Sequence, residues 1–220
     1  MDISRSLSYI ADDEDWLKKL LVGGLISLIP IVGQIYAQGY ATQVLKNIIG
    51  GKESPLPEPT EDFGDKLLHG VIAWVITTVY ALPLILLSII SGVGIALVAA
   101  AADSSDAVGV LAALTGSCAG LIGLALLVAY GLFVPYAWSA YAESLQFGDA
   151  FKLSTIWAMV KANIGQTLLT LLVIALVAIV AGSVGSAVCG IGVAFTGFYA
   201  QLVIAFLTGK LYVQTKAKTL

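Results

Sequence analysis

Four long stretches without a charged residue dominate the sequence, at 20–45, 70–102, 107–142 and 162–209. A transmembrane helix needs about 20 consecutive apolar residues. The first three stretches are therefore long enough for one crossing each, and the last is long enough for two. Barrel strands would alternate in polarity over about ten residues, a pattern that these stretches do not follow. We predict an all-α, polytopic helical membrane protein, with 1–220 forming a single integral membrane domain.

Composition agrees with this fold class. Hydrophobic residues make up 59% of the chain and charged residues 11%, whereas soluble domains are about 45–50% apolar and about 25% charged. Residues 1–15 read as an N-terminal polar tail that is retained, because they lack a basic region and a small-residue cleavage site. The net charge is −3 and the basic residues are scattered. Nucleic acid is therefore not an expected partner, and the lipid bilayer is.

The first apolar stretch carries Pro30 and Gly33 at its middle. Both residue types interrupt a helix. One arrangement is a single kinked crossing, which gives five transmembrane helices. The other is an N-terminal re-entrant helical hairpin, its tip buried in protein, followed by four full transmembrane helices.

The positive-inside rule decides between these arrangements. The turns expected at 103–106 and 182–190 contain no lysine or arginine, so we place them outside. All 11 basic residues then fall inside only if 20–45 re-enters. We therefore favour the hairpin, with both termini cytoplasmic.

Two segments outside the apolar stretches are predicted to lie at the cytoplasmic surface. The Pro-rich linker 46–66 should be extended, because its prolines oppose helix formation. Residues 149–163 read as an amphipathic helix that Asp149 caps. The apolar face of that helix comprises Leu153, Ile156, Trp157, Val160 and Ile164. Periodicity alone leaves two contacts open for this face, the membrane interface or the protein bundle.

Amide and hydroxyl groups form the candidate polar intramembrane stripe. Gln34, Gln38 and Thr42 are four residues apart and share one helical face. They could line a pathway for a neutral solute. They could also bond helix to helix, and we favour this second role because such groups commonly join membrane helices.

Small residues mark candidate helix-packing positions. Gly116 and Gly120 form one pair, and Gly182, Ser186 and Gly190 continue the four-residue spacing later in the chain. Such residues let two backbones approach closely in a membrane. Packing within the chain is the first interpretation, and association with another copy is the alternative.

The sequence shows no pattern of residues typical of a catalytic, cofactor or metal site. We expect no catalytic residue, no cofactor and no metal site, because the chain has one histidine, His69, and two cysteines, Cys118 and Cys189, which we expect to be packed and unpaired. The acids at Asp62, Asp65, Glu143 and Asp149 are assigned capping and surface roles. An ion-coupled transporter usually keeps an ionisable group inside the membrane, and these stretches contain none.

Several motifs resemble an uncharacterised prokaryotic membrane-protein family, the domain of unknown function numbered 4013. They are the acidic-Trp-Lys-Lys start in DEDWLKK, the GG…IP centre, the Pro-rich linker ending in DFGD, and the later FYAQLVIAFLTGKLY. The resemblance implies a multi-pass protein of a bacterial or archaeal plasma membrane. It supplies no catalytic residue.

Two functional classes follow from this pattern. The first is a non-enzymatic membrane scaffold or accessory subunit of a membrane complex, whose partner is another membrane protein or a second copy of the chain. The alternative is a transporter or channel for a small neutral or amphiphilic solute. We favour the first, because intramembrane charge is missing.

Overall fold

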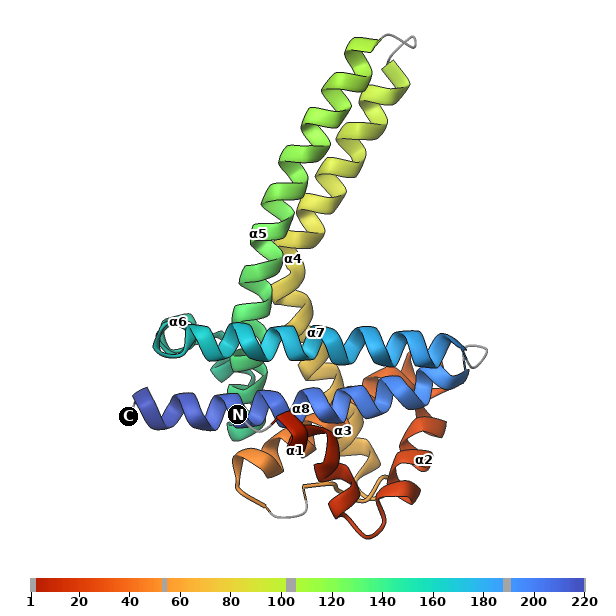
Figure 1. Ribbon diagram of the computed structural model, residues 1–220, viewed down its shortest axis with the longest axis vertical. Helices are drawn as coiled ribbons and strands as arrows, with labels where there is room; N and C mark the ends of the chain where they lie inside the picture. The colour runs from red at the N-terminus through yellow and green to blue at the C-terminus, as the bar shows by residue number, and fades with distance from the viewer. Residues whose placement is uncertain (1–2, 53–54, 102–105, 188–190, 220) are drawn as a thin grey trace.

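The computed structural model describes residues 3–52, 55–101, 106–187 and 191–219 (Figure 1). Every regular element within these ranges is helical. The elements are α1 (Ile3–Ser8), η1 (Tyr9–Asp12), α2 (Trp16–Ser27), α3 (Val32–Ile49), α4 (Phe63–Ala101), α5 (Asp106–Ser144), η2 (Phe147–Phe151), α6 (Leu153–Ala162), α7 (Ile164–Ala187) and α8 (Ile191–Thr219). Four of them, α4, α5, α7 and α8, are long and apolar enough to cross a membrane. The predicted all-α polytopic class is confirmed.

Helices α4 and α5 form a long hairpin that projects from the rest of the molecule (Figure 1). We call its projecting part the arm, residues 84–101 and 106–130, and the remainder the base. Large apolar side chains of the arm point outward, such as Ile90 and Leu121, which are 68% and 70% exposed. A helix that is apolar on all sides needs an apolar surrounding. The arm therefore has the surface of a membrane-embedded element.

The base is organised around α3, which packs against α4, α5 and α8. Gly39 of α3 and Gly70 of α4 lie where these two helices meet. A Cβ atom at Gly39 would overlap the Lys66 carbonyl, and one at Gly70 would overlap the Ile35 carbonyl. The two helices can approach this closely only because both residues lack a side chain.

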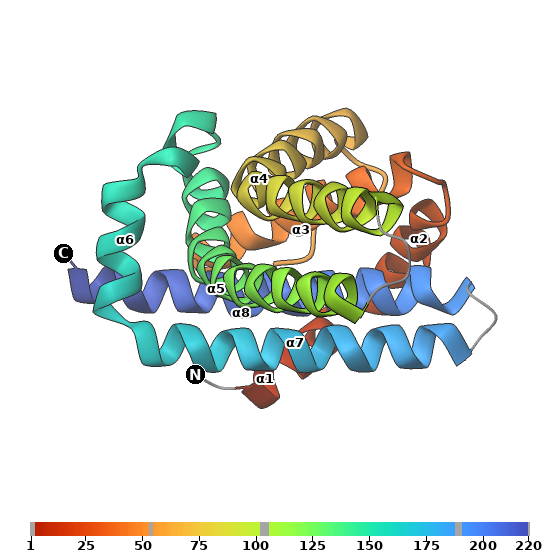
Figure 2. The same cartoon turned by 90° about the horizontal axis from the view of Figure 1, so that it is seen from above.

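Helices α7 and α8 pair along their length and run across the foot of the arm (Figures 1 and 2). The pairing is close at Gly185, where a Cβ atom would meet Val193 and Thr196. The two hairpins therefore point in different directions. Most of the predicted turn at 103–106 and the last part of the turn at 182–190 lie outside the described residues.

The first apolar stretch is divided, as its sequence predicted. Helix α2 ends at Ser27 and α3 begins at Val32, and Ile31 between them has a φ of 65°, rare for a β-branched residue. Gly33 lies against the backbone of Ser27, where a side chain would overlap it.

The prediction that protein buries this tip is wrong. Ile31 is 75% exposed, and its neighbour Ile29 is also exposed. Local bonds make the exposure possible, because the Ile29 amide donates to the Ile26 carbonyl and the Gly33 amide donates to the Ile29 carbonyl. With these amides satisfied inside the segment, lipid can cover the apolar tip.

The N-terminal segment 1–15 is more than a polar tail. Tyr9 and Ile10 of η1 are buried. The Tyr9 ring stacks on Phe206 with centroids 4.4 Å apart, and its hydroxyl donates to the Leu202 carbonyl at 2.9 Å. The segment is thereby fixed to α8, which the sequence pattern did not indicate.

Candidate functional site

The most organised polar site lies in the Pro-rich linker, over α3. We call residues 55–61 the strap. Five consecutive strap carbonyls each accept a hydrogen bond from a side chain elsewhere in the base. The donor and acceptor pairs are Asn47 to Pro55 (2.9 Å), Lys19 to Leu56 (3.2 Å), Tyr40 to Pro57 (2.7 Å), Lys66 to Glu58 (2.8 Å) and Tyr36 to Pro59 (2.8 Å). The Lys66 ammonium also donates to the Glu61 carbonyl.

The sequence explains why the strap and α3 match. Tyr36 and Tyr40 are one helical turn apart, a rise of about 6 Å. An extended Pro-rich chain advances about 3.1 Å per residue, so carbonyls of alternate residues are also about 6 Å apart. Pro57 and Pro59 therefore present their carbonyls at the spacing of the two tyrosine hydroxyls.

Two buried lysines hold the strap to the base. The Lys19 ammonium lies 2.9 Å from an Asp13 carboxylate oxygen and 3.5 Å from one of Glu58. Burial acts to lower the pKa of Lys19, but the hydrogen bond and charge of Asp13, with the charge of Glu58, outweigh it and raise that pKa. Lys66 is almost fully buried, with its ammonium 6.0 Å from the centre of the Tyr40 ring. Charge here fixes a loop in place.

The predicted polar stripe does not act as one surface. Thr42 is buried, and its hydroxyl accepts a bond from the Trp138 indole at 2.9 Å and donates to the Gln38 carbonyl at 2.8 Å. Gln34 is exposed and the Gln38 side chain is half-buried. Of the three side chains, Thr42 is the one for which the structure shows a bond between helices.

A second polar cluster, which the sequence pattern did not single out, joins α5, α7 and α8. The Tyr136 hydroxyl lies 2.7 Å from the Thr167 hydroxyl and 3.3 Å from that of Thr215. The Asn163 amide donates to Thr215 at 3.1 Å. Thr167, inside an apolar run, was the one available signal, because a buried hydroxyl requires a partner. His69 has a comparable structural role, with Nδ1 2.8 Å from the Tyr141 hydroxyl.

The predicted helix-packing glycines that the structure describes do not mark contacts within the chain. A Cβ atom at Gly116, Gly120 or Gly182 would meet nothing within 4 Å. Ser186 is exposed, and Gly190 lies outside the described residues. The glycines at which a Cβ atom would lie under 3.0 Å from another residue are Gly23, Gly24, Gly33, Gly39, Gly70, Gly185 and Gly209. The four-residue spacing was wrong as a guide to intrachain contact, because it does not say whether a second helix is present.

The predicted amphipathic helix 149–163 is divided into η2 and α6, and its apolar face serves two surroundings. Ile156 and Val160 are buried against protein. Leu153, Trp157 and Ile164 are exposed, although the Trp157 ring stacks on Phe133 with centroids 5.8 Å apart. Protein therefore covers part of this face, and the membrane interface stays the expectation for the exposed part.

The prediction that Asp149 caps this helix is wrong. The N-cap residue of α6 is Lys152, which makes no side-chain capping bond. Asp149 instead pairs with the Lys152 ammonium at 2.7 Å. This bond, together with one from Ser144, lowers the pKa of Asp149.

Three hollows are large enough for a small molecule. One of them, about 640 Å³, is lined by apolar side chains of α7 and α8 such as Leu176, Val180 and Phe195. A second, about 540 Å³, carries charges of both signs, and a third, about 360 Å³, lies beside Pro83.

Within the described parts of the chain, no three His, Cys, Asp or Glu side chains come close enough to hold a metal ion. Cys118, predicted to be packed, is an exposed free thiol, and Cys189 lies outside the described residues.

Comparison with known proteins gives a family and nothing closer. Residues 22–190 match the model of the family described as a protein of unknown function (DUF4013). No curated protein and no solved structure matches the chain. Since the match covers more than half of the sequence, the chain belongs to this family.

Proposed function

We propose that this member of the DUF4013 family is a non-enzymatic scaffold or accessory subunit of a complex in a prokaryotic plasma membrane. The observation that supports this role is the use of the interior polar groups. The hydroxyls of Thr42, Tyr136 and Thr167 bond between helices, and those of Tyr36 and Tyr40 hold the strap. Thr42, one of the three residues predicted to line a solute pathway, is therefore engaged in joining elements of the fold, as are the buried hydroxyls of α5 and α7.

The membrane placement that we propose keeps the strap in the cytoplasm. All 11 lysines and arginines lie outside the arm, and the positive-inside rule assigns the side that carries them to the cytoplasm. The two termini belong to that side. Since the hairpins α4–α5 and α7–α8 point in different directions, both cross one bilayer only if each is tilted. Helices α4 and α5 have 39 residues each, about 58 Å, which leaves length for tilt across a core of about 30 Å.

Cysteine labelling tests this placement. In a variant lacking Cys118 and Cys189, a cysteine introduced at Ser105 should react with an impermeant reagent from outside intact cells. A cysteine at Glu61, in the strap, should react only after the cells are opened. Reaction of the Glu61 cysteine in intact cells would show that the strap faces outward and that the proposed orientation is wrong.

Crosslinking tests the scaffold role. A photoreactive residue at Leu121, in the arm, should give a discrete protein adduct in native membranes, because a scaffold presents its uncovered helices to a partner or to a second copy. The same residue at Trp74, which is exposed but lies in the base, serves as the matched control. Lipid adducts alone at Leu121 would contradict the proposal.

The alternative, a transporter of a small amphiphilic solute, is favoured by one observation, the apolar groove of about 640 Å³ along α7 and α8. Flux into proteoliposomes separates the two functions. A scaffold gives no flux. Flux that is abolished by Gln34→Leu with Gln38→Leu, at an unchanged melting temperature, would establish transport.

A further inference from the structure

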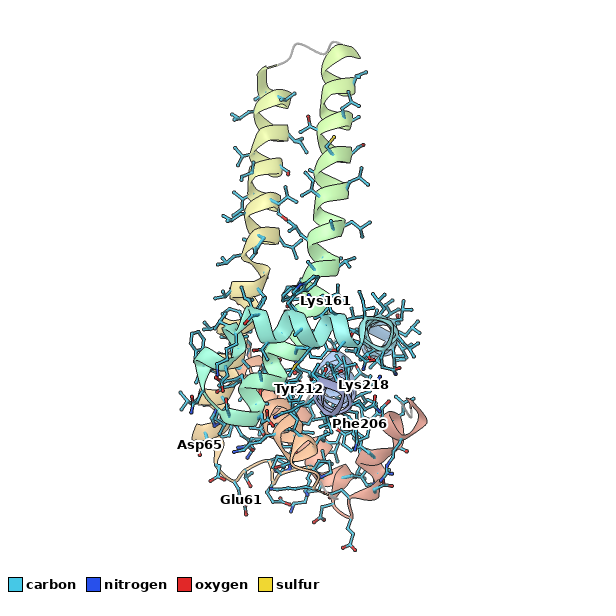
Figure 3. The ribbon with its side chains drawn as sticks, turned by 90° about the vertical axis from the view of Figure 1, so that its left-hand side faces the viewer. Glu61, Asp65, Lys161, Phe206, Tyr212 and Lys218 are labelled. Carbon is cyan, nitrogen blue, oxygen red and sulfur yellow. The ribbon has the colours of Figure 1, made fainter. Side chains whose placement is uncertain are left out.

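Charges of both signs converge in the hollow of about 540 Å³ between the end of α5, the η2–α6 segment and the end of α8, which we call the mixed-charge groove. Lys216 lies 2.6 Å from Glu143, and Lys152 lies 2.7 Å from Asp149. The Tyr212 hydroxyl donates to Glu143 at 2.9 Å. Figure 3 shows the molecule from this side, with Tyr212 of α8 labelled beneath α6, on the side away from the arm.

The Lys216–Glu143 pair is open to solvent and can be exchanged, and in the second pair Lys152 is 64% exposed while Asp149 is half-buried. The side chains of Lys216 and Glu143 are 37% and 36% exposed. Exposed pairs contribute little to stability, so each partner can take a new counter-charge at small cost. A ligand of one sign would leave the two protein charges of that same sign without a partner. A ligand with one positive and one negative group leaves none.

An apolar hollow lies on the other side of the same short segment. This junction pocket, about 360 Å³, is lined by Phe151 and Leu153 together with Tyr80, Pro83 and Phe133. Asp149, Lys152 and Ser154, from the same stretch of chain, line the mixed-charge groove. Tyr80 stacks on Phe151 with centroids 5.7 Å apart, which fixes this wall. The pocket also opens beside Leu84 and Leu126 of the arm, where acyl chains would lie.

We propose that the mixed-charge groove binds the headgroup of a zwitterionic phospholipid that carries a primary amine, with an acyl chain in the junction pocket. The ammonium group would bond to Glu143 and Asp149, and the phosphate to Lys152 and Lys216. A primary ammonium is required because carboxylates accept hydrogen bonds from its N–H groups. A quaternary ammonium has none, and is recognised by a cage of aromatic rings, whereas Tyr212 is the one aromatic residue lining this groove. The site is independent of whether the protein is a scaffold or a transporter.

A lipid titration tests the proposal. Delipidated protein in detergent is titrated with phosphatidylethanolamine, phosphatidylcholine and phosphatidylglycerol of identical chains, and with soluble glycerophosphoethanolamine, and binding is followed by native mass spectrometry. Phosphatidylethanolamine should bind roughly tenfold more tightly than each of the other three. Equal binding of phosphatidylcholine would overturn the amine assignment. Preference for phosphatidylglycerol would show that the lysines act alone and would overturn the zwitterionic site.

Variants identify the two halves of the site. Glu143→Gln with Lys216→Met removes one charge of each sign and should abolish the preference for phosphatidylethanolamine, while Asp65→Asn with Lys161→Met, away from the groove, should retain it. If the Glu143→Gln, Lys216→Met double variant folds in low yield, the single variant Asp149→Asn tests the same loss of preference for phosphatidylethanolamine. Ala129→Phe, which fills the junction pocket, should weaken lipid binding. Soluble glycerophosphoethanolamine binding as tightly as the lipid would overturn the role of the acyl chain.

Discussion

The arm and the base contain the same kinds of small and apolar residues and use them in opposite ways. In the base, Gly39 and Gly70 bring α3 and α4 together until their backbones touch. In the arm, Gly116 and Gly120 face open space. Lipid covers apolar side chains as well as protein does, so apolar surface alone does not draw a helix into the bundle. Polar side chains and irregular backbone do draw a helix into the bundle, because lipid cannot supply their hydrogen-bond partners.

The strap shows what this requirement produces in the base. Its prolines prevent a helix, which leaves carbonyls in need of donors. Tyrosines and lysines of α2, α3 and α4 supply them, and these side chains thereby tie three helices to one loop. The arm has no such loop within its described residues, and it extends as two long helices.

The sharpest test of the comparison makes one substitution in both regions. Gly39→Ala should destabilise the protein by at least about 3 kcal/mol, because the new methyl group would overlap a backbone carbonyl that cannot move without separating α3 from α4. Gly116→Ala should be neutral or stabilising by up to about 1 kcal/mol, since alanine is the better helix former. Thermal unfolding in detergent, followed by circular dichroism, measures both. Equal effects would erase the distinction between arm and base.

Removing the buried carboxylate that pairs with Lys19 should give the second-largest loss of stability. Asp13→Asn leaves the Lys19 ammonium without its closest carboxylate and should lower the free energy of unfolding by about 2–3 kcal/mol, less than for a fully isolated pair because Glu58 remains nearby. The neighbouring Asp12 is exposed, so Asp12→Asn should change stability by less than about 0.5 kcal/mol. Chemical unfolding of both variants in the same detergent gives the comparison. A larger loss in the Asp12 variant would contradict the assigned pairing.

The same pair predicts a pH dependence. The pKa of Lys19 is raised in the folded protein, above the value of about 10.4 for an unfolded lysine. Its contribution is therefore complete below about pH 10.4 and is lost as the pH rises through the folded pKa. The stability difference between wild type and Asp13→Asn should stay constant from about pH 7 to 10 and shrink above that. A difference that shrinks already near pH 8 would show that the pKa is not raised.

The tyrosine contacts of the strap should have a smaller effect. Tyr36→Phe combined with Tyr40→Phe removes two donors and should cost about 2 kcal/mol, because the Pro57 and Pro59 carbonyls lose their partners. Hydrogen exchange and limited proteolysis should show faster opening of residues 55–61. Tyr199→Phe is the matched control, since its hydroxyl bonds to the Leu7 carbonyl and not to the strap. Unchanged exchange in the double variant would show that the strap does not depend on α3.

Hydropathy was sufficient for the helical class and for the long helices, because a bilayer imposes a minimum length on apolar runs. Pro30 and Gly33 were also sufficient to place the break between α2 and α3, because their backbone restrictions are local. The strap was predicted only as an extended linker. Its carbonyls depend on donors such as Lys19 and Tyr40, which are far away in sequence and which no local pattern connects to it.

The sequence also did not predict which small residues make contacts between helices. The four-residue spacing at Gly116 and Gly120 is the same whether a partner helix is present or not. At Gly39 and Gly70 the decisive feature is the crossing of two helices, which depends on the whole fold. Tyr9 was missed for a related reason, since a single aromatic residue in a polar segment does not reveal that α8 will cover it.

The smallest expected effect on stability concerns the arm, and it sharpens the comparison most directly. Gly116→Ile with Gly120→Ile should change the free energy of unfolding by less than about 1 kcal/mol, because the new side chains meet nothing within 4 Å of their Cβ atoms. Gly23→Ile, where the Phe198 ring occupies the space, is the destabilised control. The arm variant should nevertheless weaken the protein adduct formed from Leu121, since isoleucine would fill the space into which a partner helix packs. A fall in melting temperature would show that the arm packs within its own chain, and an undiminished adduct would place the partner on another face.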